Sequence, residues 1–304
     1  MISALSKEFF LYLSKSKILN RAAKKWGLRL GASQVVAGNS LETMIVKVRE
    51  LNEKGLVCTL DHLGEFVSSE EEASAATAAA IRTLEAIAEE GLNSHLSVKL
   101  TQLGVDIDRE FCVHNMGSIL ETAQRYENFV RIDMEDYSHY KITLDILQEL
   151  RENFQNVGTV MQAYLFCAEE DIQRLQGIPL RIVKGAYKES PKVAFQHKKE
   201  IDENFINLIK IHLLSGNYTA VATHDHHMIA RVKQFVEEQQ IPRNQFEFQM
   251  LYGFRTELQQ SLADEGYKMR IYVPYGSDWF AYYMRRLAER PQNVSFALKG
   301  FFLK

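Results

Sequence analysis

The chain has 304 residues, 46% of them apolar, which is enough for a substantial core in one large domain or two small ones. Charged residues make up 25% of the chain and the net charge is −3, so the composition excludes a disordered chain and argues against nucleic acid as a partner. Three widely spaced cysteines, none in a CxxC pair, argue against a disulfide framework and a structural zinc site. We therefore expect a folded protein of the reducing cytoplasm.

The N-terminal segment is basic and amphipathic. Its first 30 residues hold seven Lys or Arg residues against one acidic residue, Glu8, and apolar residues recur at near-helical spacing. We predict a helical arm over residues 1–40, which either contacts an anionic membrane or packs its apolar face on the protein body. No apolar run reaches the roughly 18 to 20 residues of a membrane-spanning helix. Residues 41–304 form the predicted catalytic domain.

From about residue 56 onward, short β-rich runs alternate with helical patterns, and no linker interrupts them. The predicted strands are 56–61, 95–100, 129–134, 159–164, 180–184, 219–223, 246–250 and 270–273. Helical patterns cover 69–91, 112–128, 141–153, 195–216, 226–240, 256–266 and 278–289. This alternation indicates a parallel sheet, and eight such units in about 230 residues match a (β/α)8 barrel. The Gly-rich turn of a doubly wound dinucleotide-binding sheet and the P-loop motif are both missing from the sequence.

Polar residues stand at the ends of nearly all predicted strands. In a barrel enzyme, the reacting groups lie at the carboxyl ends of the strands. The residues at these ends are Asp61, Lys99, Thr101, Gln102, Asp133, Glu135, Asp136, Gln162, Arg181, Lys184, Thr223, His224, Asp225, Gln249 and Tyr272. Because a buried charge is costly unless it is paired, we expect these side chains to share one site, where they neutralise one another and a ligand.

Each of these residues also has a purely structural interpretation. Lys99 and Lys184 fit lysines that reach solvent from strand ends, and Asp133 fits the cap of the helix that begins near residue 140. Three histidines around Asp225 raise the question of a metal site, but two of them fit the first turn of the next helix. We predict that no metal is bound.

The last predicted helix carries Tyr282, Arg285, Arg286 and Glu289 on one stripe, at spacings of three and four residues. Adjacent arginines often form a solvated helix face. The planar Arg side chain also binds a carboxylate through two parallel N–H bonds. An Arg pair opposite Lys99 would therefore suit an anionic small substrate.

The strand-end motifs form a set that points to a known family. They are SVKL (97–100), RIDME (131–135), QAY (162–164), RIVKGAY (181–187), ATHD (222–225), EFQMLYG (247–253), RIYVP (270–274) and YYMRRLAE (282–289). Together they closely resemble the flavin-dependent proline dehydrogenases, in particular the monofunctional bacterial type. The resemblance covers about residues 30 to 295, and eight motifs in register are highly specific although each alone is weak.

The resemblance implies a distorted (β/α)8 barrel that holds FAD at its carboxyl face and oxidises L-proline to 1-pyrroline-5-carboxylate. It further implies that a membrane quinone accepts the electrons. A separate pyrroline-5-carboxylate dehydrogenase is expected to act on the product, because the chain stops at Lys304 without a second catalytic domain. The expected location is cytoplasmic, with the basic N-terminal arm as a peripheral contact on the inner face of the membrane.

The resemblance also assigns site residues. Lys99, Tyr272, Arg285 and Arg286 would surround proline, and the three cations would neutralise its carboxylate. The implied catalytic residues are Asp133, which would orient the lysine, and Arg181, near the hydride-accepting ring nitrogen. The flavin would be lined by Met134, Gln162, Arg181, Val183, Lys184, Gly185, Thr223 and His224. Tyr282 and Glu289 would brace the closing helix.

Other functions stay open on the residues alone. A Schiff-base aldolase uses a reactive lysine at a strand end, a role for which Lys99 or Lys184 qualifies. A metal-dependent barrel hydrolase is a second alternative, with Asp61, His224 and Asp225 as ligands. A non-enzymatic scaffold is a weaker alternative, since it needs no charges at so many strand ends.

Overall fold

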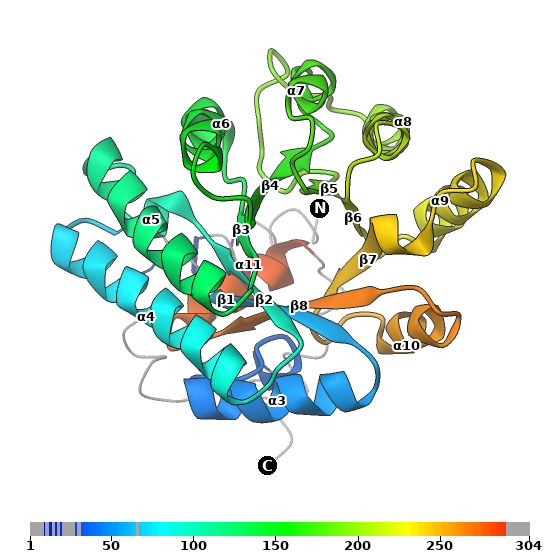
Figure 1. The fold of residues 1–304 in the computed structure, drawn as a ribbon. Coiled ribbons are helices and arrows are strands. Elements are labelled where there is room, and N and C mark those ends of the chain that lie inside the picture. Colours follow the sequence, from blue (N-terminus) through cyan, green and yellow to red (C-terminus); the bar gives the residue numbers. More distant parts are fainter. Residues whose placement is uncertain are drawn as a thin grey trace.

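Eight parallel strands form a closed barrel surrounded by helices in the computed structural model of this chain (Figure 1). The structure describes residues 32–64 and 67–289, together with residues 9, 12, 13, 16, 19 and 28; for residues 288 and 289 it describes the backbone alone. The strands pair in chain order, and β8 (Met269–Tyr275) pairs with β1 (Val57–His62) to close the barrel. The predicted (β/α)8 barrel is confirmed.

Strands and helices alternate along the described chain. The other strands are β2 (Ser94–Val98), β3 (Val130–Ile132), β4 (Val157–Gln162), β5 (Leu180–Val183), β6 (Thr219–Ala222) and β7 (Phe246–Leu251). The helices are α3 (Leu41–Glu53), α4 (Glu70–Glu89), α5 (Arg109–Arg125), α6 (Tyr137–Arg151), α7 (Ala168–Arg174), α8 (Lys198–Leu214), α9 (His226–Glu238), α10 (Thr256–Asp264) and α11 (Trp279–Glu289). Short 3-10 helices are η1 (Ala32–Gln34), η2 (Leu100–Gln102) and η3 (Arg243–Gln245).

The observed strands overlap all eight predicted ones, and the differences have local causes. Strand β2 ends at Val98, before its predicted end, because the chain turns into η2 at Leu100. Helix α7 is absent from the prediction because its seven residues are too few for an apolar period to be recognised. Helix α3, also absent from it, does carry a readable signal, since Ser40 and Thr43 form a capping box at its start.

Charged side chains lie inside the barrel as well as at its rim. In the amino-terminal half, Arg270 Nε donates to Glu247 Oε1 at 2.7 Å, and Arg131 Nη1 donates to the Thr159 carbonyl oxygen at 2.9 Å. Side chains alternate between the two faces of a strand, so the residue two positions later points inward again, one layer nearer the carboxyl end. The residues two positions after Arg131, Glu247 and Arg270 are, in that order, Asp133, Gln249 and Tyr272. The strand alternation therefore builds a second polar layer at the carboxyl end.

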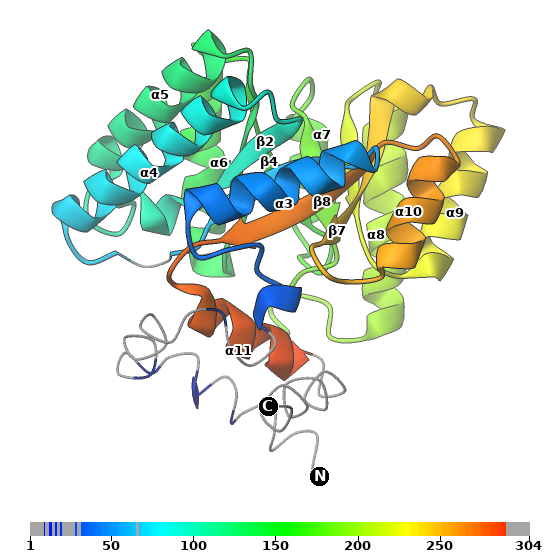
Figure 2. The ribbon, with the colours of Figure 1, turned by 90° about the horizontal axis from the view of Figure 1, so that it is seen from below.

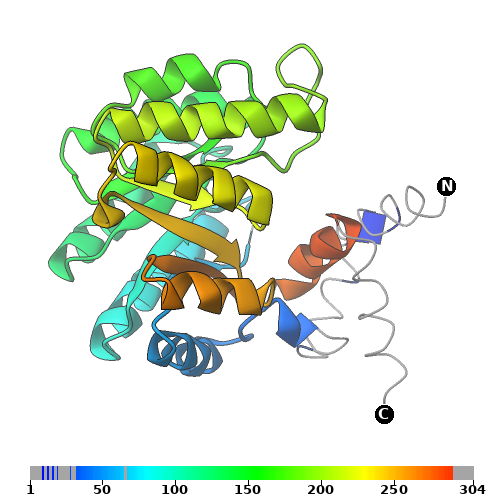
Figure 3. The ribbon, with the colours of Figure 1, turned by 90° about the vertical axis from the view of Figure 1, so that its right-hand side faces the viewer.

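Helix α11 covers the carboxyl end of the barrel, beyond the ends of the strands (Figures 2 and 3). Its apolar face packs against η1 in a cluster made of Ala32, Val36, Leu63, Trp279, Tyr282, Tyr283, Met284 and Leu287. Leu13 and Leu28, from the predicted N-terminal arm, pack against this cluster, and most of the rest of that arm lies outside the described residues. Among the helices that the structure describes, none is long and apolar enough to cross a membrane.

Replacing Glu247 with Gln tests the amino-terminal polar layer. Burial alone would raise the pKa of Glu247, but the charge and hydrogen bond of Arg270 hold it at about 2. Lowering the pKa from 4.5 to about 2 on folding stabilises the native state by about 3 kcal/mol at neutral pH. In urea unfolding at pH 7, we expect Glu247→Gln to lose stability of that order. The difference from wild type should shrink as the pH falls from about 5 toward 2, and a pH-independent difference would contradict the ion pair.

Candidate active site

The carboxylate of Asp133 is the centre of the polar layer at the carboxyl end. Ser97 Oγ of β2 donates to its Oδ1 at 3.0 Å, and Arg181 Nη1 of β5 donates to the same oxygen at 2.6 Å. The Tyr272 hydroxyl of β8 donates to Oδ2 at 2.7 Å, and Arg181 Nη2 also donates to Ser97 Oγ at 3.1 Å. One buried carboxylate therefore ties together side chains from three other strands.

Electrostatics fix the protonation of this cluster. Burial would raise the pKa of Asp133, but the charges of Arg181 and Lys99 and two hydroxyl hydrogen bonds lower it below its usual value. Burial, together with the negative charges of Asp133 and Asp61, raises the pKa of Tyr272 well above its usual value. Asp133 is therefore an anion that accepts hydrogen bonds, and Tyr272 keeps its proton at all physiological pH values.

Lys99 is paired with Asp61 rather than bound closely by Asp133. Its Nζ lies 3.0 Å from both Asp61 carboxylate oxygens and 4.0 Å from Asp133 Oδ2. Lys99 is 9% exposed and Asp61 only 1%. This pairing of Asp61 with Lys99 was not predicted from the sequence, although both residues stand at strand ends. The available signal was that β1 and β2 are adjacent in any (β/α)8 barrel, so their terminal charges must meet.

The three carboxylates after β3, those of Asp133, Glu135 and Asp136, have different hydrogen-bond partners. Asp136 caps α6, accepting from the N–H of His139, so Asp133 is free for the site and the cap interpretation for it is wrong. Glu135 accepts from the backbone N–H of Thr101 at 3.1 Å and from its hydroxyl at 2.6 Å, which fixes η2 beside the site. The sequence alone could not decide which of three close carboxylates would cap the helix.

Lys184, at the end of β5, belongs to a second ion-pair group. Its Nζ lies 2.5 Å from Asp202 Oδ1 and 3.2 Å from Asp225 Oδ2, and Lys198 pairs with both carboxylates as well. Asp225 also caps α9 by accepting from the N–H of His227. A lysine that forms a Schiff base needs an amine that can attack a carbonyl, whereas the Lys184 amine is held by two carboxylates and the Lys99 amine by Asp61. The geometry therefore disfavours the aldolase alternative.

The three ligands of the hydrolase alternative are engaged separately. Asp61 pairs with Lys99, Asp225 pairs with Lys184, and His224 Nε2 accepts the backbone N–H of Leu251 at 3.0 Å. That hydrogen bond leaves the ring proton of His224 on Nδ1. Within the described ranges, no group of three or more His, Cys, Asp or Glu side chains is arranged to hold a metal ion.

The residues predicted to line a flavin all lie at the carboxyl ends of β3 to β6. They are Met134, Gln162, Arg181, Val183, Lys184, Gly185, Thr223 and His224. Gln162 Nε2 donates to the Glu135 carbonyl oxygen at 2.9 Å, and Gly185 has a φ of +114° that favours glycine. Arg181 Nε is buried and has no hydrogen-bond partner in the described part of the chain. A buried donor of this kind suits a ligand with ring nitrogen or carbonyl acceptors, so the residues fit FAD.

The two arginines predicted to bind the substrate lie on α11, the helix over the carboxyl end. Both Arg285 and Arg286 are half-buried, and the Arg286 guanidinium lies 5.2 Å from the ring centroid of Tyr282. Tyr282 is itself buried in the α11 cluster, in keeping with a bracing role. The side chain of Glu289, the other predicted bracing residue, lies outside the described residues.

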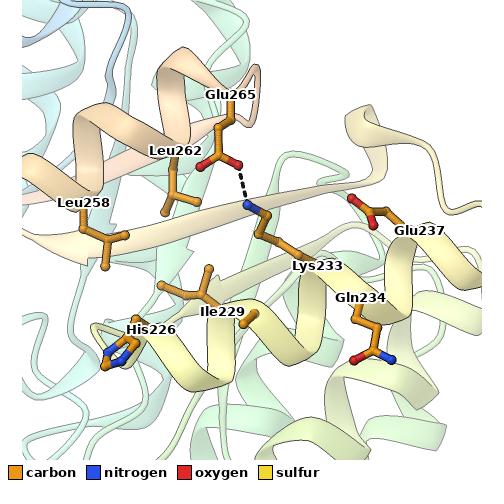
Figure 4. A pocket seen from close by; sticks show the side chains of 9 residues that line it. His226, Ile229, Lys233, Gln234, Glu237, Leu258, Leu262 and Glu265 are labelled. Atoms are coloured by element: carbon orange, nitrogen blue, oxygen red, sulfur yellow. Dashed lines mark hydrogen bonds and ion pairs between the residues drawn. The ribbon is translucent and has the colours of Figure 1, made fainter.

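A surface groove of about 350 Å³ lies away from this cluster, between α9 and α10 (Figure 4). Ile229, Leu258 and Leu262 form its apolar floor, and the ion pair of Lys233 with Glu265 crosses it. It lies between two outer helices and includes none of the strand-end residues. The groove therefore has no part in the chemistry at the barrel mouth.

Comparisons with known proteins identify the family of this chain. The family model described as proline dehydrogenase matches residues 44–299. The chain belongs to the proline dehydrogenase family. Proline dehydrogenases 1 and 2 of Bacillus subtilis strain 168 are 52% and 50% identical, over 98% and 99% of this chain and 99% and 100% of theirs. The proline dehydrogenase of Deinococcus radiodurans is 38% identical over 99% of both chains.

Longer members of the proline dehydrogenase family share the barrel. The crystal structure of proline utilization A from Bdellovibrio bacteriovorus, inactivated by N-propargylglycine, matches with a TM-score of 0.80 and 27% identity. The match covers 89% of this chain and 34% of that one. The bifunctional protein PutA of Escherichia coli is 26% identical over 97% of this chain and 26% of its own length. The predicted family is confirmed, and proline oxidation is the activity that membership supports.

Replacing Tyr272 with Phe tests the centre of the site. The change removes the 2.7 Å hydrogen bond to Asp133 Oδ2 and leaves a buried charged oxygen short of a donor. We expect the free energy of unfolding to fall by about 1 to 3 kcal/mol in urea titrations. The control is Tyr126→Phe, which alters a half-exposed tyrosine at the end of α5 and should cost far less. Equal losses in both variants would mean that the Tyr272 hydroxyl does not support Asp133.

Proposed function

We propose that this chain is an FAD-dependent enzyme that oxidises L-proline to 1-pyrroline-5-carboxylate and passes the electrons to a membrane quinone. The observation that carries the proposal is the buried Asp133–Arg181–Tyr272 cluster beside the Asp61–Lys99 pair, at the carboxyl end of the barrel. Membership of the proline dehydrogenase family supports proline as the substrate.

Substrate binding is assigned to three cations and one aromatic ring. Lys99 directly follows β2 at the carboxyl end of the barrel, and Arg285 and Arg286 belong to the helix that covers this end. An Arg side chain binds a carboxylate through two parallel N–H bonds, so these residues hold proline by its carboxylate. The Tyr272 ring, fixed by its hydroxyl hydrogen bond and by Arg181 at 5.1 Å from its centroid, forms a wall of the pocket.

The chemical step removes a hydride from C5 of proline while a C5=N double bond forms, and the ring nitrogen gives up a proton. The hydride leaves readily only when the nitrogen is a free amine. Cations around the substrate disfavour the ammonium form and so lower the cost of losing that proton. The cluster offers no strong base, because Asp133 already accepts three donors and Tyr272 stays protonated. The role assigned to Asp133 is therefore to hold Arg181 and Tyr272 in place.

The flavin site is assigned to the carboxyl ends of β3 to β6. When bound, FAD supplies the two-electron acceptor. Arg181 contributes a guanidinium already anchored on Asp133 and Ser97, with its buried Nε as the remaining donor toward the cofactor. A fixed cation beside the cofactor would stabilise the negative charge that the cofactor gains on reduction. The cation is already in place, so no reorganisation of the protein is needed, as in an oxyanion hole.

The electron acceptor and the location follow from the sequence rather than from the described structure. A lipid-soluble quinone requires approach to a membrane, and the basic amphipathic segment within residues 1–40 provides a peripheral contact on its cytoplasmic face. Relatives named bifunctional are about four times longer than their match to this chain. We assign oxidation of the product to a separate pyrroline-5-carboxylate dehydrogenase.

The absorption spectrum of the purified protein tests the proposed function directly. A flavin enzyme is yellow, and the flavin band should bleach on anaerobic addition of L-proline and return on addition of a soluble quinone. D-proline serves as the control, because it carries the same charges as L-proline and has the opposite configuration. A colourless preparation, or a yellow one that L-proline does not bleach, would refute the proposal.

Replacing Arg285 or Arg286 with Met tests the carboxylate clamp. Each change removes one charge-assisted contact, so we expect the KM for L-proline to rise at least about tenfold, with flavin content unchanged. Steady-state kinetics and the flavin-to-protein absorbance ratio measure the two effects separately. If proline affinity is unchanged in both variants, the arginines do not bind the carboxylate.

Replacing Arg181 with Met tests the electrostatic role at the cofactor. Stopped-flow measurements should show slower flavin reduction, and redox titration should show a more negative flavin potential, because the nearby positive charge is lost. Arg181→Lys keeps the charge and should restore part of the shift. If rate and potential are both unaltered in Arg181→Met, this residue is not at the reaction centre.

A further inference from the structure

Asp61 enters the function proposed above only as the partner of Lys99, yet it is one of the most buried charged residues that the structure describes. It stands at the carboxyl end of β1, where backbone pairing sets it beside Ser97 of β2 and Pro274 of β8. Its carboxylate is therefore fixed by the barrel itself rather than by a loop. Both carboxylate oxygens lie 3.0 Å from Lys99 Nζ.

Asp133 does not replace Asp61 in this pair. Its two oxygens accept hydrogen bonds from Ser97, Arg181 and Tyr272. Lys99 Nζ is 4.0 Å from Asp133 Oδ2, the same oxygen that accepts the Tyr272 hydroxyl. A lysine drawn fully onto Asp133 would compete with Tyr272 for that oxygen and would leave the place it now occupies.

We propose that Asp61 is a positioning residue, which holds Lys99 charged and in place so that its ammonium can bind the carboxylate of the substrate. The inference rests on the proposed oxidation of proline at this site. Without the Asp61 charge, a buried ammonium either moves onto Asp133 or gives up its proton, because an uncompensated buried charge is costly. Both responses remove one of the cations that bind the substrate.

The Asp61→Asn variant tests this role in the flavin-loaded protein. The amide keeps the shape of the side chain and removes its charge. The probe is tetrahydrofuran-2-carboxylate, which has the ring and carboxylate of proline but no amine to oxidise, and its affinity is measured by calorimetry. We expect at least about tenfold weaker probe binding and a similar rise in the KM for L-proline, with a smaller change in kcat.

The matched control is Glu247→Gln, one polar layer below. It also breaks a buried carboxylate–cation pair at 2.7 Å, so it should lower the melting temperature as Asp61→Asn does. Because that pair lies in the amino-terminal layer, probe affinity should stay at the wild-type value. If Glu247→Gln weakens probe binding as much as Asp61→Asn does, the effect is general destabilisation and the inference is wrong.

A double-mutant cycle with Lys99→Met shows whether Asp61 acts through Lys99. In that background Asp61 is a buried carboxylate without its cation, so adding Asp61→Asn should leave probe affinity unchanged and raise the melting temperature. An equal loss of affinity in both backgrounds would refute a role through Lys99, as would wild-type affinity in the single Asp61→Asn variant.

The two proposals fail in different ways. If the wild-type flavin is not bleached by L-proline, the proposed function is wrong and the inference about Asp61 falls with it. If wild type is bleached and binds the probe, but Asp61→Asn binds it equally well, only the inference is wrong.

Discussion

The need to compensate one buried carboxylate organises the carboxyl end of this barrel. Asp133 is largely buried, so water solvates its charge poorly and the charge is compensated by donors from β2, β5 and β8. Two of those donors, Arg181 and Tyr272, are the side chains that the proposed function places beside the cofactor and the substrate. Because Arg181 and Tyr272 are held by the same anion, neither can move without exposing an unpaired charge, and the site is preorganised before a ligand arrives.

The fold could be predicted because its signals are local. Eight β-rich runs separated by helical patterns required a parallel sheet, and their number matched a closed barrel. Helix α7 escaped because it is short, and the end of β2 was misplaced because nothing local distinguishes a strand residue from the 3-10 turn at Leu100. The two-residue period of the strands also accounts for the two polar layers. Arg131 and Arg270 precede Asp133 and Tyr272 by two residues and lie on the same inward face.

The composition of the site was predictable, whereas its pairing was not. Strand-end charges identified Lys99, Asp133 and Arg181, and the resemblance gave them roles. The pairing of carboxylates with cations depends on the distances between side chains in the folded barrel. Spacing along the chain does not determine those distances. The resemblance associated Lys99 with Asp133, whereas in the structure the close ion pairs are Lys99 with Asp61 and Arg181 with Asp133.

This pairing has a consequence for how the barrel attracts a substrate. Asp61 balances Lys99 and Asp133 balances Arg181, so these four side chains together carry little net charge. Four balanced charges exert little long-range pull on a carboxylate, so the proposed function also relies on Arg285 and Arg286 of α11 to bind it. Helix α11 itself packs over the barrel through its apolar cluster with η1. Under the proposed function, substrate affinity and the seating of α11 over the barrel are therefore coupled, because the helix that covers the barrel also carries two of the cations assigned to the substrate carboxylate.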